Sequence, residues 1–183
     1  DDDVLTKARR GHTAGDVVAA TELLRQYGFT VGHQLMPGLP GEDWDSLVRT
    51  TDAICRLQPD LARIYPVAVL TGTDLADSWR AGCYHALTIH EGVVRAAYMK
   101  QRFLEQGINC IRTGLQATED LDDDTQVLAG AYTPAMGELV DTRRYGRQLL
   151  SFLRSLPAGP GITICYNRRD TSRVRGYRNV TVK

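Results

Sequence analysis

The order of helical and extended patterns constrains this chain more than any other feature. Three amphipathic helix patterns each precede a short apolar run, and we expect these segments in the order 13–27, 29–36, 44–58, 61–69, 89–105 and 109–115. Helices that alternate with strands are typical of a parallel sheet with helices on its outside. Crossovers of this length are usual in barrels and doubly wound sheets. The sequence therefore predicts an α/β fold.

Local signals support the expected helices. Thr13 and Asp16 form a capping-box pattern, with Asp in place of Glu, and Gly28 is a helix-ending residue. After residue 115 the alternation stops: we expect an acidic loop at 117–137, a helix at 138–156 and two strands at 162–166 and 174–182. The chain is thus expected to divide into residues 1–116 and a small α+β extension, residues 117–183.

The charge distribution is uneven although the formal net charge is zero. Residues 1–142 hold 12 Lys/Arg and 21 Asp/Glu, a net of −9, whereas residues 143–183 hold 10 Lys/Arg and one acid, a net of +9. Such a tail can bind a polyanion or an acidic lipid surface, or pack on the acidic body of its own protein. The longest apolar runs are too short to cross a membrane, and the start resembles no signal peptide.

The four cysteines, at positions 55, 83, 110 and 165, are too far apart for a CxxC metal knuckle and match no secreted disulfide framework. We interpret them as free thiols of a cytoplasmic protein. Asp1-Asp2-Asp3 at the start suggests a chain cut from a longer one.

Candidate ligand-binding residues lie where the expected strands end, because chemistry sits there in parallel α/β folds. In the first strand Gln34 and Met36 are expected to face the sheet interior, and His33 is expected on the opposite, apolar set as a structural residue. The following turn, 36–42, holds two glycines and two prolines. It is either a stiff loop whose amides bind an anion or a purine edge, or an ordinary strand-to-helix turn.

Two later strands place arginines at comparable positions. Arg63 and Tyr65 are expected on one face of the second strand, and Arg112 lies in the third. A buried arginine needs a partner, because an unpaired buried charge is costly. That partner could be a carboxylate of a ligand or one of the protein.

Several short motifs follow one another in an order that resembles one known family. They are Arg10-Gly11-His12-Thr13, Met36-Pro37-Gly38-Leu39-Pro40-Gly41, Arg63-Ile64-Tyr65-Pro66, Thr71-Gly72-Thr73-Asp74-Leu75, Gly82-Cys83-Tyr84 and Ile111-Arg112-Thr113-Gly114-Leu115-Gln116. This series resembles the radical S-adenosylmethionine (SAM) proteins related to the Elongator catalytic subunit, in particular their short bacterial members. The resemblance covers roughly residues 4–145.

The resemblance implies the C-terminal half of a partial (β/α)6 TIM-like barrel in which a [4Fe-4S] cluster reduces SAM to a 5′-deoxyadenosyl radical. It implies cofactor contacts for Arg10, His12, Gln34, Met36 and Gly38. Arg63, Tyr65 and Arg112 would then face the substrate. The parent protein would be an oxidoreductase, either one that modifies tRNA or one similar to the oxygen-independent coproporphyrinogen oxidases.

The chain departs from the family because it has no C-x3-C-x2-C type motif, so we expect no cluster ligands in it. Alone it is expected to be inactive and to bind SAM weakly at most. Its expected partner is the missing N-terminal half of its barrel, and tRNA is a second candidate partner. We expect the fragment to self-associate through its open sheet edge.

Two alternatives remain at this point. The chain could be an RNA-binding module in which the basic segment 143–183 supplies phosphate contacts and stacking surfaces. These residues are Arg143, Arg144, Tyr145, Arg147, Tyr166, Arg168, Arg169, Arg173, Arg175, Tyr177 and Arg178. It could also be a barrel relic that serves only as a scaffold.

Overall fold

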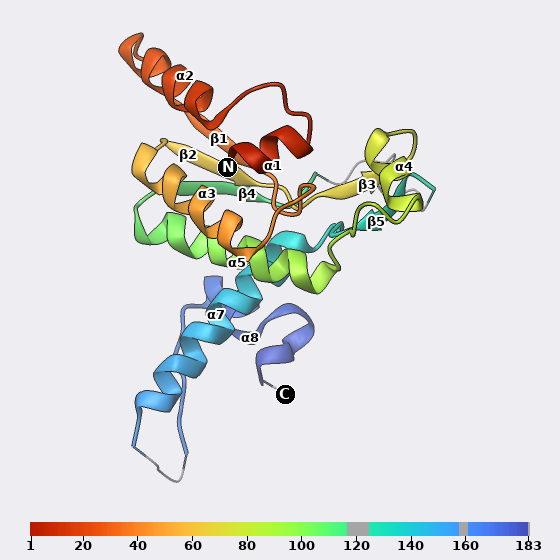
Figure 1. The fold of residues 1–183 in the computed structure, drawn as a ribbon. Coiled ribbons are helices and arrows are strands. Elements are labelled where there is room, and N and C mark those ends of the chain that lie inside the picture. Colours follow the sequence, from red (N-terminus) through yellow and green to blue (C-terminus); the bar gives the residue numbers. More distant parts are fainter. Residues whose placement is uncertain (117–124, 158–160, 183) are drawn as a thin grey trace.

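The computed structural model describes residues 1–116, 125–157 and 161–182. At its centre lies a three-stranded sheet in the order β1 (Gly32–Leu35), β2 (Leu61–Ile64) and β4 (Asn109–Thr113) (Figure 1). Both strand pairs are parallel. The predicted α/β fold with a parallel sheet is therefore confirmed.

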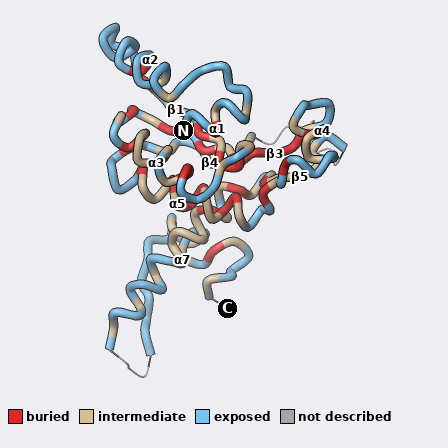
Figure 2. The backbone as a smooth tube through the Cα atoms, in the orientation of Figure 1, coloured by how far each residue is buried: buried red, intermediate tan, exposed pale blue. Residues whose placement is uncertain are grey.

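Three helices match the segments expected from the sequence: α2 (Ala14–Gln26), α3 (Trp44–Leu57) and α5 (Ile89–Glu105). Each begins with a capping box, including the Thr13–Asp16 box predicted from the sequence. Helices α3 and α5 pack on the same face of the sheet, whereas α2 projects from the molecule and is almost entirely exposed (Figure 2).

The core lies between the sheet and helices α3 and α5. Ala62 and Ile64 of β2 are fully buried there and pack with Leu47 of α3 and Phe103 of α5. The alternation in β2 explains this arrangement, because successive side chains point to opposite faces of a strand. Trp44 departs from the sequence prediction: it was expected on the buried face of α3 but is 42% exposed, against Tyr98.

The expected strand 61–69 is interrupted. Pro66 separates β2 from β3 (Ala68–Leu70), which pairs antiparallel with β5 (Val127–Gly130) and carries helix α4 (Asp74–Arg80) at its end (Figure 1). Proline lacks the amide that a central strand must donate, so the chain leaves the parallel sheet there. The prediction of a continuous loop at 117–137 was wrong for β5, while 117–124 lie outside the described residues.

The C-terminal region differs most from expectation. Helix α7 (Met136–Ser155) is confirmed, but the two strands predicted at 162–166 and 174–182 were wrong. Residues 161–167 have no regular structure; η1 (Arg168–Asp170), α8 (Thr171–Arg175) and η2 (Tyr177–Val182) follow. The Tyr177 amide donates to Thr142 Oγ1 on α7 over 2.8 Å, and Arg178 and Asn179 have positive φ. Packing on α7 thus overrides the extended pattern of the β-branched residues.

Helix α7 joins the main core through Met136 and Val140. The division of the chain into residues 1–116 and 117–183 stays a prediction. Asp141 fixes this contact: its carboxylate lies 2.7 Å from Lys100 Nζ of α5 and 3.2 Å from Arg144. Beyond it α7 projects as an arm (Figure 1).

At the other end of the chain, residues before Arg9 form helix α1 (Asp2–Lys7). Asp1 caps α1 and pairs with Arg49 of α3. Among the described residues, no helix has the length and apolar content needed to cross a membrane.

Candidate functional site: the loop after β1 and the open sheet face

The loop at 36–42, which the sequence analysis singled out, is held at its centre by side chains from two places. The Gly38 amide donates to the Glu42 carboxylate over 2.8 Å, and the Tyr84 hydroxyl donates to the Gly38 carbonyl over 2.6 Å. Gly38 has φ +101°, a region that L side chains rarely adopt. Both backbone polar groups of Gly38 are therefore engaged within the protein.

Glu42 is an unusual carboxylate because its side chain is only 9% exposed. Its one cationic contact among the described residues is Arg95 of α5, whose Nε lies 3.4 Å away without hydrogen-bond geometry. Burial raises the pKa of Glu42 to about 7, although the Gly38 amide and Arg95 both act in the opposite direction. Ionised Glu42 thus reduces the stability of the fold, and such groups cluster at functional sites.

Replacing Glu42 with glutamine removes this titration. Because the pKa of Glu42 is higher in the folded state than the ordinary 4.5, wild-type stability falls as pH rises from about 4.5 through about 7. Glu42→Gln keeps an acceptor for the Gly38 amide but does not ionise. Its stability relative to wild type is therefore expected to rise by about 1–3 kcal/mol between pH 4.5 and pH 8.

Urea denaturation at several pH values measures this difference. Glu22→Gln, a change at an exposed position of α2, is the matched control and should show a constant difference from wild type. A relative stability of Glu42→Gln that stays constant or falls would show that the Arg95 ion pair outweighs the cost of burial.

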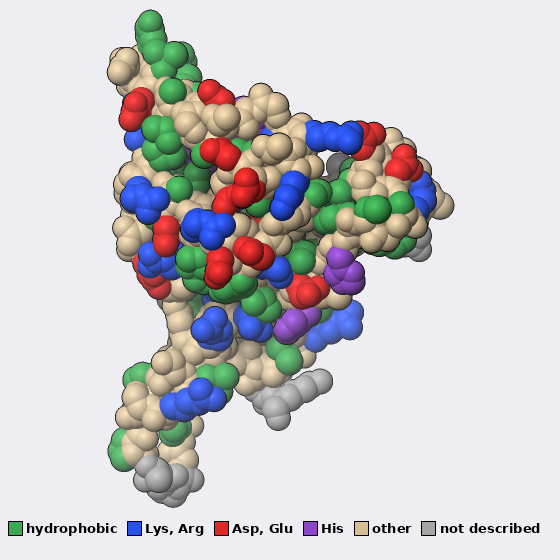
Figure 3. All heavy atoms as spheres, in the orientation of Figure 1, with side chains coloured by type: hydrophobic (Ala, Val, Ile, Leu, Met, Phe, Trp, Pro, Cys, Tyr) green, Lys and Arg blue, Asp and Glu red, His purple; other side chains and the backbone are tan. Residues whose placement is uncertain are grey.

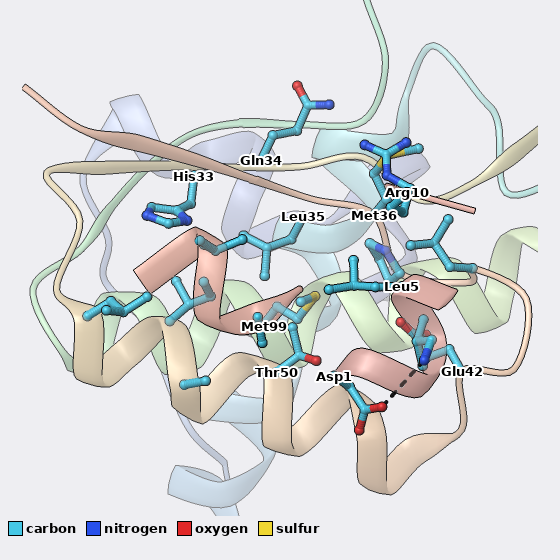
Figure 4. Close-up of a pocket in the computed structure, with 18 of the residues that line it drawn as sticks. Asp1, Leu5, Arg10, His33, Gln34, Leu35, Met36, Glu42, Thr50 and Met99 are labelled. Carbon is cyan, nitrogen blue, oxygen red and sulfur yellow. Dashed lines mark hydrogen bonds between the residues drawn. The ribbon is translucent and has the colours of Figure 1, made fainter. Parts of the chain in front are cut away.

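A cavity of about 370 Å³ lies between β1, α3 and the N-terminal helices (Figure 4). Four of the five residues predicted to bind the cofactor line it: Arg10, His12, Gln34 and Met36. The fifth, Gly38, is buried behind the wall of this cavity and could act only through the shape of the loop. In Figure 4, Arg10 lies beside Met36, while the Gln34 side chain leaves β1 on the side opposite Leu35.

His33 also lines this cavity, but its contacts are structural. Its Nε2 atom lies 3.0 Å from the hydroxyl of Thr21, a buried residue of α2. Burial, with a smaller effect of Arg25, lowers the pKa of His33. The interpretation of His33 as a satisfied structural histidine agrees with these contacts.

A second cavity, of about 640 Å³, lies on the other side of Arg10, Met36 and Leu39. Its far wall is formed by α4 and the segment after it, including Cys83 and Tyr84. An exposed ion pair between Arg9 and Asp74, 3.0 Å long, bridges the two walls. The loop and the Arg9-Arg10 turn therefore separate two neighbouring hollows beyond the carboxyl end of β1.

The parallel sheet presents a polar row on the face opposite α3 and α5. The strand register aligns Gln34 of β1 with Arg63 of β2, and Arg63 with Arg112 of β4. The expectation that these arginines are buried was wrong, because Arg63 and Arg112 are exposed and make no ion pair with another described residue. No other described element buries Arg63 or Arg112 on this face of the sheet, so their charge remains hydrated. Tyr65 is half-buried at the end of β2.

The sequence analysis did not assign roles to Glu42, Tyr84 or Arg95. The turn 36–42, which ends in Glu42, and the Gly82-Cys83-Tyr84 motif contained the signal for the first two. Arg95 lies in an ordinary amphipathic helix and had no sequence signal.

The described residues do not fit an iron–sulfur cluster. Three neighbouring thiolates are the usual ligands, but Cys55 is buried, Cys83 and Cys165 are exposed on separate elements, and Cys110 is in β4. Within the described part of the chain, no group of three His, Cys, Asp or Glu residues could hold a metal ion.

Comparison with known proteins gives the class. Residues 59–145 match the family model described as the radical SAM C-terminal domain. In this chain that range includes β2, β4, α5 and the start of α7. The matched range includes Arg63 and Arg112, whereas β1 precedes it in the sequence.

Individual relatives narrow this class. The chain is 35% identical over 101 residues to a tRNA uridine(34) acetyltransferase of Methanocaldococcus jannaschii, covering 54% of this chain and 19% of the relative. It is 41% identical over 87 residues to the protein of the same name from Dehalococcoides mccartyi, covering 46% and 19%. Elongator complex protein 3 of Homo sapiens is 30% identical over 86 residues, covering 45% of this chain and 16% of the human protein.

A solved structure agrees with these relatives. The archaeal Methanocaldococcus infernus Elp3 with an N-terminal deletion superposes with a TM-score of 0.67 at 26% identity, over 81% of this chain and 34% of the archaeal chain. Residues 59–145 thus match a domain of the radical SAM class, and the chain is similar to proteins related to the Elongator catalytic subunit, as its motifs predicted. It spans about a fifth of the length of the acetyltransferase relatives it matches.

Proposed function

We propose that this chain forms the SAM- and substrate-facing part of a partial (β/α)6 barrel in a radical SAM enzyme, and that the cluster ligands belong to another part of that enzyme. The observation that carries the proposal is the exposed row of Gln34, Arg63 and Arg112 on a parallel sheet, directly beside the clamped loop 36–42. An uncovered parallel sheet face is unusual, because such sheets are ordinarily covered on both sides.

The residues around the loop suit the chemical groups of SAM. Met36 and Leu39 offer apolar contact for an adenine, and the guanidinium of Arg10 or Arg63 can bind the carboxylate in a bidentate way. SAM, once bound, would supply the 5′-deoxyadenosyl group that abstracts hydrogen from the substrate. The chain itself would orient SAM and shield it from water.

The test uses the whole enzyme that contains this chain, reconstituted anaerobically with iron and sulfide. Arg63→Ala with Arg112→Ala is expected to weaken SAM binding or the release of 5′-deoxyadenosine at least tenfold, since each charged hydrogen bond contributes about 1.5–3 kcal/mol. Arg154→Ala, at the far end of α7, is the control. Activity unchanged by the double substitution, or about four iron atoms bound by residues 1–183 alone, would contradict the proposal.

A second candidate, RNA binding by the basic segment 143–183, rests on a separate observation. Six arginines there are exposed and make no ion pair with another described residue: Arg147, Arg154, Arg168, Arg169, Arg175 and Arg178. Only Arg144 and Arg173 pair with carboxylates in the described part of this segment, with Asp141 and Asp170 respectively. On the face in Figure 3, the charged side chains visible on the projecting end of α7 are basic.

The aromatic residues of this segment differ in how accessible they are. Tyr145 is flanked by Arg144 and Arg173, each 5.9 Å from its ring centroid, whereas Tyr166 is 42% exposed. Proteins that bind single-stranded nucleic acid combine two components. Basic side chains contact the phosphates, and exposed aromatic rings stack on the bases. Because two of the relatives are tRNA uridine(34) acetyltransferases, we propose tRNA as the polyanion.

Salt dependence tests this second candidate. The affinity of the segment for tRNA should fall steeply as the salt concentration rises. The double substitution Arg168→Ala and Arg169→Ala should reduce the slope of the logarithm of the association constant against log[salt] by about 1.4. Arg56→Ala with Arg80→Ala, at exposed positions of α3 and α4, should leave the slope unchanged. An absence of binding at low salt would remove this function.

A further inference from the structure

The Gly38 backbone is held at its N–H and at its C=O by two residues that are far from each other in the sequence. Glu42 accepts its N–H, and Tyr84, 46 positions away, donates to its carbonyl. The space around it is also filled: a Cβ added at Gly38 would lie 2.7 Å from Leu87 and 3.6 Å from Val67. The loop therefore has one conformation as long as both hydrogen bonds persist.

The groups that face Glu42 come from four elements. Arg95 of α5 lies 3.4 Å away, Tyr84 shares Gly38 with it, and Asp43 follows it in the chain. The Lys7 side chain of α1 lies against Gly41, the residue before Glu42. Arg95 is the only cation among these in direct contact, and its Nε has no hydrogen-bond partner among the described residues.

We propose that Glu42 and Tyr84 are positioning residues that hold the loop 36–42 in the conformation that receives SAM, and that the charge on Glu42 sets the affinity for SAM. The inference rests on the proposed function of this loop. An ionised carboxylate binds the Gly38 amide more strongly than a neutral carboxyl, and it neutralises Arg95. Protonation therefore weakens the hold on Gly38 and leaves the buried Nε of Arg95 facing a neutral carboxyl group.

The expected direction follows from this arrangement. Glu42 titrates close to neutrality because it is buried, so the ionised fraction grows as pH rises from 6 to 8. SAM should consequently bind more tightly at pH 8 than at pH 6. A hydrogen bond to a charged group exceeds a neutral one by about 1 kcal/mol, which corresponds to about a fivefold change in the dissociation constant.

The experiment measures the dissociation constant for SAM in the reconstituted whole enzyme at pH 6, 7 and 8. Wild type and the control Glu22→Gln should gain about fivefold in affinity over this range. Glu42→Gln should show a flat profile, near the wild-type value at pH 6. Tyr84→Phe should weaken binding at every pH, with the slope retained, because it removes the other hydrogen bond.

Hydrogen exchange of the backbone amides of residues 36–42, measured without SAM, tests the hold on the loop independently of the proposed function. If wild type binds no SAM, the proposed function fails, and with it the claim that Glu42 controls affinity. If SAM binds but Glu42→Gln keeps the wild-type pH slope, only the inference is overturned. Unchanged exchange protection of the Gly38 amide in Glu42→Ala would likewise overturn it, because the clamp would not hold the loop.

Discussion

Replacing Phe103 with alanine is expected to lower the free energy of unfolding by about 3–5 kcal/mol, the range for a large aromatic residue removed from a well-packed core. Phe103 is fully buried in α5 and belongs to the cluster that supports β2 and β4. The loss has two parts: the apolar ring no longer leaves water on folding, and the surrounding side chains close the cavity only in part. Urea or thermal denaturation measures it.

The neighbouring residue is a matched control for this substitution. Leu104 follows Phe103 in the same helix but is 44% exposed, so Leu104→Ala should cost less than about 1 kcal/mol. Similar losses for the two variants would mean that α5 does not pack on the sheet through Phe103. The assignment of the core, and with it the support beneath Arg63 and Arg112, would then be wrong.

A Gly130→Ala substitution is expected to destabilise the fold by about 3 kcal/mol or more, because two costs combine. Gly130 has φ +102°, and an added Cβ would lie 2.6 Å from the Val67 carbonyl oxygen and 2.9 Å from Ala68 Cα. Those atoms are backbone and cannot turn aside as a flexible side chain can. The change should separate β3 from β5.

Gly107→Ala isolates the conformational part of this cost. Gly107 ends α5 with φ +74°, but nothing lies within 4 Å of a Cβ added there. Its substitution should cost about 1 kcal/mol, the penalty for a left-handed backbone alone. If the two glycine variants lose equal stability, the close approach of the β5 backbone to β3 does not exist in solution.

The regular part of the fold could be predicted from the sequence because its signals are local. Helix α5 begins at a capping box and repeats apolar residues at helical spacing, so its bounds matched expectation. The strands at 162–166 and 174–182 failed for the opposite reason. Their β-branched residues suggested extension, but the conformation is decided by contacts with α7 that no local pattern contains.

The candidate site divides in the same way. Met36 and Arg10 were identified from short motifs, and they line the same hollow. The exposure of Arg63 was not predictable, because alternation along a strand gives a face but does not say whether anything covers it. The partners of Gly38 were hidden for a related reason: Tyr84 and Arg95 reach the loop only after the chain has folded.

The attachment of α7 gives its outer end mechanical leverage. Asp141 holds the helix to Lys100 near its start, and Ser155 lies 14 residues further along. At 1.5 Å per residue this makes a lever of about 21 Å, so a tilt of about 10° at the carboxylate would displace the tip by about 4 Å. A small rotation at one ion pair can thus carry the arm across a distance comparable to the spacing of neighbouring β-strands.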